Sequence, residues 1–313
     1  MRSCMKLLFL FCSDSNLDPV APAVFHQAKI HYEATPSTFI VGGQKVFQAK
    51  VKEHQLFFSE TQRFASESYP EIAVQLNSQF SDVDMIGLVN WHAGANAPAK
   101  IFCAHSTADV PSGIFGPTSG KLLAATLMAI EEERCIADLT DFRTLFEASH
   151  WSGLTYGRQA SELMQVRAPV FDIEIGSFPD EWANPAAQRV LVRALGRIPD
   201  FCSINKPRAL YLGGVHFEPS ATEIVFRSAV LEHHLPNQWL VNGEYNLPGA
   251  EEKIIAAAKS CLSAPELIVF HDGLKSPYKE NGRKAAELLG IPCVSHKKLR
   301  APDWRQTVLG EPI

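Results

Sequence analysis

The sequence lacks any long hydrophobic run, and this absence excludes a membrane-spanning helix. No stretch approaches the roughly 20 apolar residues that such a helix requires. The apolar run at residues 7–11, which follows Arg2 and Lys6, is too short for the hydrophobic segment of a secretory signal peptide. We therefore expect a cytoplasmic protein that does not bind a membrane.

Disulfide and zinc-finger signatures are also missing. The seven cysteines are odd in number and show no Cys-x-x-Cys spacing, which is typical of reduced thiols in a cytosol. The chain has no basic excess either, since its net charge is -5 and its pI is about 6.1. Any nucleic acid must therefore be bound by a local patch and not by the field of the whole protein.

What the chain does contain is enough apolar sequence for a large core. Its 313 residues are 46% hydrophobic and 20% charged, as in ordinary globular proteins. Apolar runs typical of strands alternate with periodic segments typical of helices. Strands are expected from Leu7 and at 38–41, 45–51, 55–58, 85–89, 170–175, 209–212, 267–270 and 291–294. Helices are expected at 19–28, 70–80, 119–134, 180–195, 221–233, 249–261 and 278–289.

This order predicts an α/β fold with a mixed, largely parallel sheet and flanking helices. We expect a single α/β domain over residues 1–313, with a strand-rich elaboration near residues 30–60 and a hairpin turn at Gly42-Gly43. Ligands of open α/β sheets bind where strands end and loops begin. Polar residues that directly follow apolar runs are therefore the first candidates for a site.

Four places of this kind carry an imidazole or a carboxylate. The side chains are His92, His105, His150, Glu174 and His216. Hydrolysis of an activated ester needs a water aimed at the carbonyl, a group that takes its proton, and donors for the oxyanion. The histidines could serve as the base or as ligands of zinc, which lowers the pKa of its bound water to about 7. No pair has His-x-x-x-His spacing, so a shared metal requires separate loops to converge.

Each of these residues also has a structural interpretation. A single histidine at a strand end often caps a backbone group or packs in a half-buried place. Glu174 lies in an apolar strand, where an ionised carboxylate must be paired or have a raised pKa, so a buried salt bridge is the alternative to a functional role. His233 and His234 fall in a predicted helix and are expected to be surface or core residues.

Other chemistries find less support. Cys103 and His105 would share one face of a strand, but a small buried cysteine is the favoured interpretation. Ser152 lacks the Gly-x-Ser-x-Gly elbow, and residues 116–122 are one residue short of a phosphate-binding loop and lack its final Ser/Thr. Nucleotide hydrolysis is therefore not expected, although Gly120-Lys121 opens a helix that could bind one phosphate of an RNA backbone.

A basic patch is expected late in the chain. Its cations are Lys275, Lys279, Arg283, Lys284, Lys297, Lys298 and Arg300, interleaved with Tyr278 and Trp304. Such a patch combines charge for phosphates with aromatic rings for stacking. Lys275 and Lys279 are predicted to bind the substrate, and plain solvation of a charged helix face is the alternative.

These segments, taken in order, resemble the archaeal and plant type of D-aminoacyl-tRNA deacylase. Residues 147–150, Glu-Ala-Ser-His, resemble that family's Glu-Ala-Thr-His-His segment, and residues 171–177 with 181–182 resemble its Glu-Ile-Gly-Ser…Trp segment. Residues 213–219 resemble its Gly-Gly-Gly-His-Tyr-x-Pro motif. The resemblance spans nearly the whole chain and is strongest over 84–220. Trp151, Val215 and Phe217 stand where the family has His, Gly and Tyr, and residues 90–93 differ from its Arg-His-Ser-Ser.

The resemblance implies an α/β fold like those of phosphorylases and peptidyl-tRNA hydrolases, hydrolysis of D-aminoacyl-tRNA, and a dependence on zinc. We accordingly predict a loop-built site in which the four histidines His92, His105, His150 and His216 are metal ligands or base. Glu174 is expected to orient a histidine or hold the substrate amine. The amides of Gly213 and Gly214 are expected to bind the oxyanion or the adenosine.

The implied partner is aminoacylated tRNA, and the oligomeric state stays open between a monomer and a homodimer. Two other functions are alternatives to this hydrolysis. One is a hydrolase of another small ester or amide that uses the same pocket without tRNA. The other is a non-catalytic RNA-binding relative.

Overall fold

The computed structural model describes residues 4–94 and 96–311. The chain forms two compact units, each built from three separate segments. The first comprises Met1–Ala104, Ala125–Leu145 and Ser152–Ser203, and the second comprises His105–Ala124, Phe146–Trp151 and Ile204–Ile313. The short segment Phe146–Trp151 thus belongs to the second unit although the sequence on both sides of it belongs to the first.

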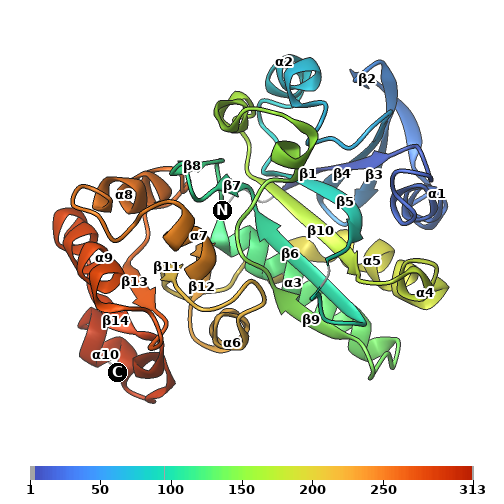
Figure 1. The fold of residues 1–313 in the computed structure, drawn as a ribbon. Coiled ribbons are helices and arrows are strands. Elements are labelled where there is room, and N and C mark those ends of the chain that lie inside the picture. The colour runs from blue at the N-terminus through green and yellow to red at the C-terminus, as the bar shows by residue number, and fades with distance from the viewer. Residues whose placement is uncertain (1–3, 95, 312–313) are drawn as a thin grey trace. The chain divides into compact units, whose positions relative to one another are not determined.

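The first unit is organised by an eight-stranded sheet with the order β2-β3-β4-β1-β5-β10-β6-β9 (Figure 1). The strands are β1 (Lys6–Cys12), β2 (Thr35–Val41), β3 (Gln44–Val51), β4 (His54–Thr61), β5 (Met85–His92), β6 (Ile101–Ser106), β9 (Arg143–Phe146) and β10 (Val170–Gly176). β1 pairs in parallel with β4 and β5, and β5 pairs in parallel with β10. β2, β3 and β4 form an antiparallel ribbon.

Helices complete the first unit. They are α1 (Ala21–His31), α2 (Tyr69–Gln79), the larger part of α3 (Gly120–Ile136), α4 (Pro179–Trp182) and α5 (Pro185–Leu195), with 3-10 turns at Ser152–Tyr156, Ala160–Gln165 and Ile198–Phe201. α5 begins with Pro185 after Asn184, whose side chain accepts from the amides of Ala186 and Ala187. Such a cap satisfies amides that the first helical turn leaves without a partner.

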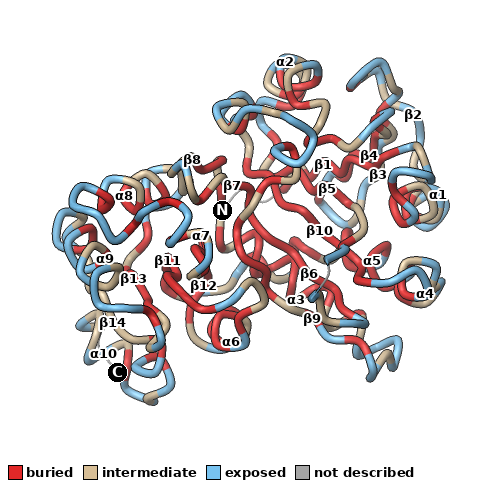
Figure 2. Tube along the Cα trace, viewed as in Figure 1, coloured by how far each residue is buried: buried red, intermediate tan, exposed pale blue. Residues whose placement is uncertain are grey.

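Burial explains why the central strands form. In β1 every residue from Leu7 to Cys12 is buried, as expected for a strand of a parallel sheet that is covered on both faces (Figure 2). The turn between β2 and β3 consists of Gly42 and Gly43, both with positive φ, which is the conformation that two-residue hairpins of type I′ require. The hairpin predicted at these glycines is therefore confirmed.

The second unit contains a four-stranded sheet in the order β12-β11-β13-β14, and its pairs are all parallel. The strands are β11 (Arg208–Leu212), β12 (Val230–Leu235), β13 (Leu267–Phe270) and β14 (Cys293–Ser295), and a separate hairpin joins β7 (Ala108–Asp109) to β8 (Ile114–Phe115). The helices are α6 (Pro219–Arg227), α7 (Asn237–Asn242), α8 (Glu251–Lys259), α9 (Ser276–Leu289) and α10 (Trp304–Leu309), with a 3-10 turn at His296–Arg300.

The strand order of the second unit creates a switch point beside β11. The chain continues from β11 to its neighbour β12 on one side and then crosses to β13 on the other side. The loops that follow β11 and β13 therefore leave the sheet in opposite directions, and ligands of α/β sheets bind at such places. The loop after β11 contains Gly213, Gly214 and His216.

Two predicted helices differ from the structure. The one expected over 180–195 is divided into α4 and α5. Residues 221–233 were expected to form a single helix, but α6 ends at Arg227 and residues 230–235 form the buried strand β12. Glu232, His233 and His234 do not alternate with apolar residues, because both faces of β12 are buried, and each of these side chains makes an internal hydrogen bond. His233 and His234 are therefore core residues of a strand.

The predicted fold class is confirmed. The chain has a mixed, largely parallel eight-stranded sheet, a second parallel sheet and flanking helices. Across residues 4–94 and 96–311, no helix combines the length and the apolar character that crossing a bilayer requires.

Candidate functional site

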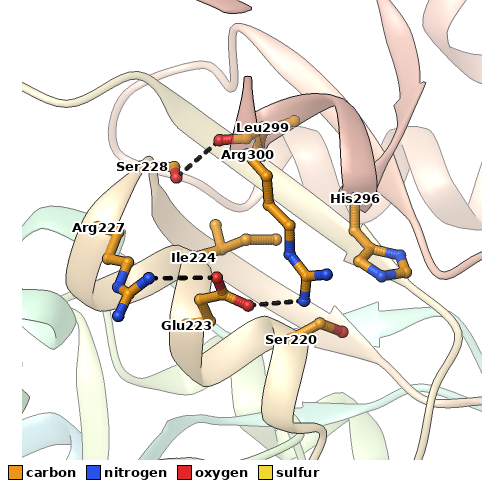
Figure 3. A pocket seen from close by; sticks show the side chains of 8 residues that line it. All are labelled: Ser220, Glu223, Ile224, Arg227, Ser228, His296, Leu299 and Arg300. Carbon is orange, nitrogen blue, oxygen red and sulfur yellow. Dashed lines mark hydrogen bonds and ion pairs between the residues drawn. The ribbon is translucent and has the colours of Figure 1, made fainter. Parts of the chain in front are cut away.

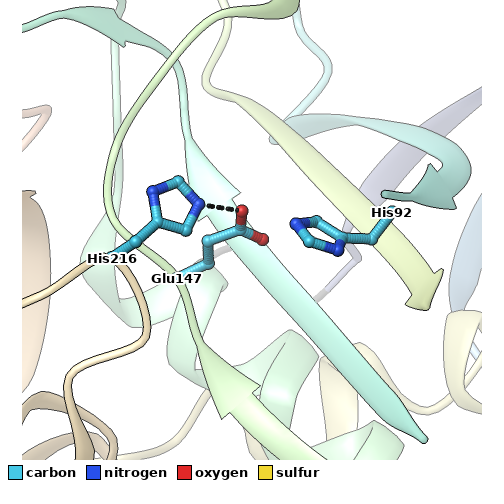
Figure 4. A group of neighbouring side chains, drawn as sticks. All are labelled: His92, Glu147 and His216. Atoms are coloured by element: carbon cyan, nitrogen blue, oxygen red, sulfur yellow. Dashed lines mark hydrogen bonds and ion pairs between the residues drawn. The ribbon is translucent and has the colours of Figure 1, made fainter. Parts of the chain in front are cut away.

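Three of the predicted histidines come together in the second unit around Glu147. His105 lies at the end of β6, Glu147 and His150 lie in the segment after β9, and His216 lies in the loop after β11. The Nε2 atom of His216 is 2.5 Å from Oε1 of Glu147, a contact drawn in Figure 4, and Nε2 of His150 is 3.9 Å from the same oxygen. Glu147 is fully buried, whereas His150 and His216 are partly exposed. A buried carboxylate thus faces bases that solvent can reach.

The rings of this cluster are packed against one another. The ring centroids of His105 and His150 are 3.8 Å apart with 23° between the planes, and those of His150 and His216 are 5.1 Å apart. Trp239 of α7 lies beside the two exposed rings, with centroid distances of 5.7 Å to His150 and 5.3 Å to His216. The indole therefore forms an apolar wall next to them.

Hydrogen bonds to the backbone define which nitrogen of each stacked ring carries the proton. Nδ1 of His150 is 2.9 Å from the carbonyl oxygen of Ala148, and Nδ1 of His105 is 3.1 Å from that of Ser106. A carbonyl oxygen only accepts, so Nδ1 carries the proton in the neutral form of each ring. The lone pair of each ring is consequently on Nε2.

His150 is held in its neutral form. Burial and then the neighbouring His105 lower the pKa of His150 well below its usual value, and the carboxylate of Glu147 offsets only part of that effect. The ring therefore presents an unprotonated nitrogen at neutral pH, as a base or a metal ligand must.

The donor set of this cluster fits a zinc ion. A ring nitrogen of His105, a ring nitrogen of His150 and a carboxylate oxygen of Glu147 all lie within 4.8 Å of one another. Two imidazoles and a carboxylate with room for water are the ligands of many catalytic zinc sites. The Nδ1–H bonds to backbone carbonyls are the outer contacts that orient such ligands.

The loop after β11 approaches its neighbours so closely that it needs glycine. Gly213 and Gly214 have φ values of 97° and 76°, and a Cβ on Gly214 would lie 2.5 Å from a carboxylate oxygen of Glu218. The amide of Gly213 donates to the carbonyl of Leu235 at 2.8 Å. Of the two amides predicted to bind an oxyanion or adenosine, that of Gly213 is thus engaged by the edge strand β12.

The predicted lysines lie at the carboxyl end of the neighbouring strand β13. Lys275 immediately precedes α9 and is exposed. Nζ of Lys279 donates to the carbonyl of Asp272 at 2.8 Å and lies over the ring of Phe270. Both lysines therefore follow the strand that borders the switch point.

His92 and Glu174 belong to the first unit, where they lie on two adjacent parallel strands: His92 ends β5, and Glu174 lies inside β10. Glu174 of β10 is opposite Asn90 of β5, and Gly176 is opposite His92. Nδ1 of His92 is 3.0 Å from Oγ of Ser177, and the buried Cys103 thiol is 3.5 Å from Oε2 of Glu174. His92 is thus at a strand end and Glu174 inside an apolar strand, as predicted.

Two residues of the histidine cluster have no role in the sequence-based prediction. Glu147 lies in the segment 147–150 that resembles the family, but no function was predicted for it. Its position three residues before His150 is a signal that could have identified it. Trp239 gives no signal, because nothing near it in the sequence marks it as a neighbour of His150 or His216.

A cavity elsewhere in the second unit has a different lining. It has a volume of about 340 Å³, and its lining residues are Ser220, Glu223, Ile224, Arg227, Ser228, His296, Leu299 and Arg300 (Figure 3). Glu223 accepts from Arg300 at 2.7 Å and lies 3.6 Å from Arg227. Apart from Arg300 of the basic patch, no predicted site residue lines this cavity, so it is separate from the histidine cluster.

Comparison with known proteins identifies similar sequences. Residues 79–294 match the family model described as D-aminoacyl-tRNA deacylase. A D-aminoacyl-tRNA deacylase of Halobacterium salinarum is 24% identical over 61% of this chain and 40% of its own length. The D-aminoacyl-tRNA deacylase of Archaeoglobus fulgidus is 21% identical over 71% of this chain and 76% of its own length. The chain therefore spans less than half of the Halobacterium relative.

Among solved structures, the fold is similar to that of a conserved protein of unknown function. The TM-score is 0.74 at 19% sequence identity, over 96% of this chain and 98% of that chain. This similarity extends to the fold of the whole chain.

Proposed function

Since the chain belongs to the D-aminoacyl-tRNA deacylase family, we propose that it hydrolyses the ester bond of D-aminoacyl-tRNA and releases a D-amino acid and free tRNA. The observation that carries the proposal is the cluster of His105, Glu147, His150 and His216 in the second unit. It places a neutral imidazole, a second imidazole paired with a buried carboxylate, and an apolar wall around one accessible place. A cytoplasmic location is proposed together with this substrate.

The chemistry proposed for His216 is general base catalysis. Glu147 accepts a hydrogen bond from Nε2 of His216, which orients the ring and directs the base function to Nδ1. A water oxygen attacks the ester carbonyl carbon while its proton passes to this ring. The carbon–oxygen bond to the tRNA ribose then breaks, and the ribose oxygen takes the proton from the imidazolium. The Gly214 amide is the proposed donor to the oxyanion.

Zinc is the proposed cofactor, with His105, His150 and Glu147 as its ligands. When bound, a zinc ion would supply a water of pKa about 7 and polarise the ester carbonyl. The protein contributes two rings whose Nδ1 atoms are anchored to backbone carbonyls, so that Nε2 is the nitrogen that would bind the ion. His92 stays a predicted ligand or base, and Glu174 a predicted anchor for the substrate amine.

The experiment that tests this function compares matched D- and L-aminoacyl-tRNA as substrates of the purified protein. We expect hydrolysis of the D-form, and a loss of at least 100-fold in kcat/KM for His150→Ala and His216→Ala, as for removal of a catalytic base or ligand. His26→Ala, which removes an exposed histidine of α1, is the matched control and should keep full activity. A chelator should abolish activity, and added zinc should restore it.

The two other functions predict different results. Turnover of free small esters or amides without any activity on charged tRNA would assign the site to a different substrate. Binding of tRNA without hydrolysis, unchanged in His150→Ala, would assign the protein to RNA binding. Folded, zinc-supplied protein that hydrolyses neither D- nor L-aminoacyl-tRNA would contradict the proposed function.

A further inference from the structure

His233 of β12 is buried completely and contacts two serines that adjoin the histidine cluster. Its Nδ1 atom is 2.9 Å from Oγ of Ser106 and 3.2 Å from Oγ of Ser149. The two serine oxygens are 2.8 Å apart. Ser106 directly follows His105, and Ser149 directly precedes His150. The contacts of His233 therefore join the two chain segments that carry the stacked rings.

The serines lie behind the rings and not among them. His105 and Ser106 are successive residues of β6, and successive side chains of a strand point to opposite faces. The amide of His234 also donates to Oγ of Ser149, and the amide of Ser149 donates to the carbonyl of His234, both at 3.0 Å. β12 is thus hydrogen-bonded twice to the segment that carries Glu147 and His150.

The hydrogens of this network can be assigned without conflict. Oγ of Ser260 donates to the carbonyl of Ala257 at 2.8 Å, so it accepts from Nε2 of His233 at 3.0 Å. Nδ1 of the neutral ring then accepts one serine hydroxyl proton, and the oxygen of that serine accepts the hydroxyl proton of the other. Burial lowers the pKa of His233 to about 3 and keeps the ring in this form at neutral pH. Every proton of the network has one acceptor, as a rigid buried polar network requires.

We propose that His233 is a positioning residue that fixes the separation and orientation of His105 and His150 through Ser106 and Ser149. A role of this trio as a nucleophile and base does not fit, because Ser106, Ser149 and His233 are all fully buried. The expected loss of activity rests on the proposed function, whereas the expected change in the relative position of His105 and His150 does not. Removing such a supporting contact typically costs 10- to 100-fold in activity or metal affinity.

The test uses substitutions that separate the two ring nitrogens. The shorter side chain in His233→Asn places an amide oxygen near the position of Nδ1, whereas the longer one in His233→Gln reaches the position of Nε2. We expect His233→Asn to keep kcat within about threefold of the wild type. His233→Gln and Ser106→Ala should lose roughly 10- to 100-fold in kcat, while KM stays within twofold. If a His233 variant fails to fold, Ser106→Ala still tests the proposal.

A second measurement reports the geometry without activity. In protein with labelled histidines, ring-to-ring NOEs between His105 and His150 should be present in the wild type and in His233→Asn, and weakened in His233→Gln and Ser106→Ala. Ile254→Ala is the control, because it opens a cavity in the core of the second unit without touching the serines. Ile254→Ala should lose as much thermal stability as the His233 variants and keep the NOEs between His105 and His150.

The outcomes are distinguishable. Unchanged NOEs and kcat in both His233→Gln and Ser106→Ala would overturn the positioning role, as would an equal loss in Ile254→Ala. If the wild type hydrolyses no aminoacyl-tRNA but its NOEs respond as expected, the proposed function fails and the positioning role stands.

Discussion

At the residue scale, Glu147 is a buried carboxylate whose Oε1 atom faces an imidazole nitrogen of His216 at 2.5 Å and one of His150 at 3.9 Å. A side chain in this place sets the orientation of one ring and the charge that both rings experience. Its function cannot be read from the local sequence, because its main partner lies 69 residues further along the chain. The sequence could mark the segment as important but could not pair it with the loop after β11.

We predict that Glu147→Gln lowers kcat/KM by roughly 10- to 100-fold, since the amide keeps the size of the side chain and removes its charge. Steady-state deacylation, together with zinc binding, measures the effect. Glu133→Gln is the matched control: Glu133 is also a buried glutamate, and its partner is Arg197 in the first unit. Equal activity of the Glu147→Gln variant and the wild type would remove Glu147 from the proposed mechanism.

At the scale of elements, the strand ends were predictable and the pairing of distant strands was not. Apolar runs located most of the strands, and the polar residues after them include His92, His105 and His216, which do lie at strand ends. β12 was mistaken for the end of a helix, because the run Glu232-His233-His234 looks like a solvated stretch. Glu232 and His233 bond to partners as far apart in the sequence as Ser106, Gly120 and Ser260, so no local pattern predicts a strand.

The start of α1 leads to a prediction about pH. Oδ1 of the fully buried Asp18 accepts from the amides of Val20 and Ala21, both at 2.8 Å. Burial raises the pKa of Asp18 to about 7, against the opposing effect of these hydrogen bonds. The folded chain therefore retains a proton that the unfolded chain releases near pH 4. This proton makes its full contribution to the free energy of unfolding below pH 4, and the contribution is lost as the pH rises to about 7.

Asp18→Asn keeps an acceptor for the two amides and carries no charge. We expect its Tm to exceed that of the wild type by a few degrees at pH 8, with the difference shrinking towards pH 5. Thermal unfolding followed by circular dichroism across this range measures it. Asp14→Asn, at a partly exposed turn, is the control and should follow the wild type. A difference that is constant with pH would contradict the assigned pKa.

At the scale of the whole molecule, the charge of -5 means that tRNA must be bound by a local group of cations. The basic patch predicted from the sequence includes Lys275 and Lys279, which follow β13 at the border of the switch point. The two-unit organisation, by contrast, could not be predicted, because each unit is assembled from segments that alternate along the chain. The prediction of a single domain over residues 1–313 stays a prediction.

We predict that the double variant Lys275→Ala/Lys279→Ala weakens tRNA binding and reduces the slope of log Kobs against log salt by roughly 1 to 2, as for the loss of one or two phosphate contacts. Titrations at several salt concentrations measure this slope. Lys45→Ala/Lys50→Ala, which removes two exposed lysines of β3 in the first unit, is the matched control. The same slope in both double variants would exclude Lys275 and Lys279 as phosphate contacts.

The segment Phe146–Trp151 also sets the order in which the protein can mature on the ribosome. Glu147 and His150 are translated before β11 and β12, to which their segment is hydrogen-bonded through the carbonyls of His216 and His234. At translation rates of about 5–20 residues per second, several seconds pass between the synthesis of that segment and the synthesis of its hydrogen-bond partners. A nascent chain that has not yet passed His216 lacks one ring of the histidine cluster.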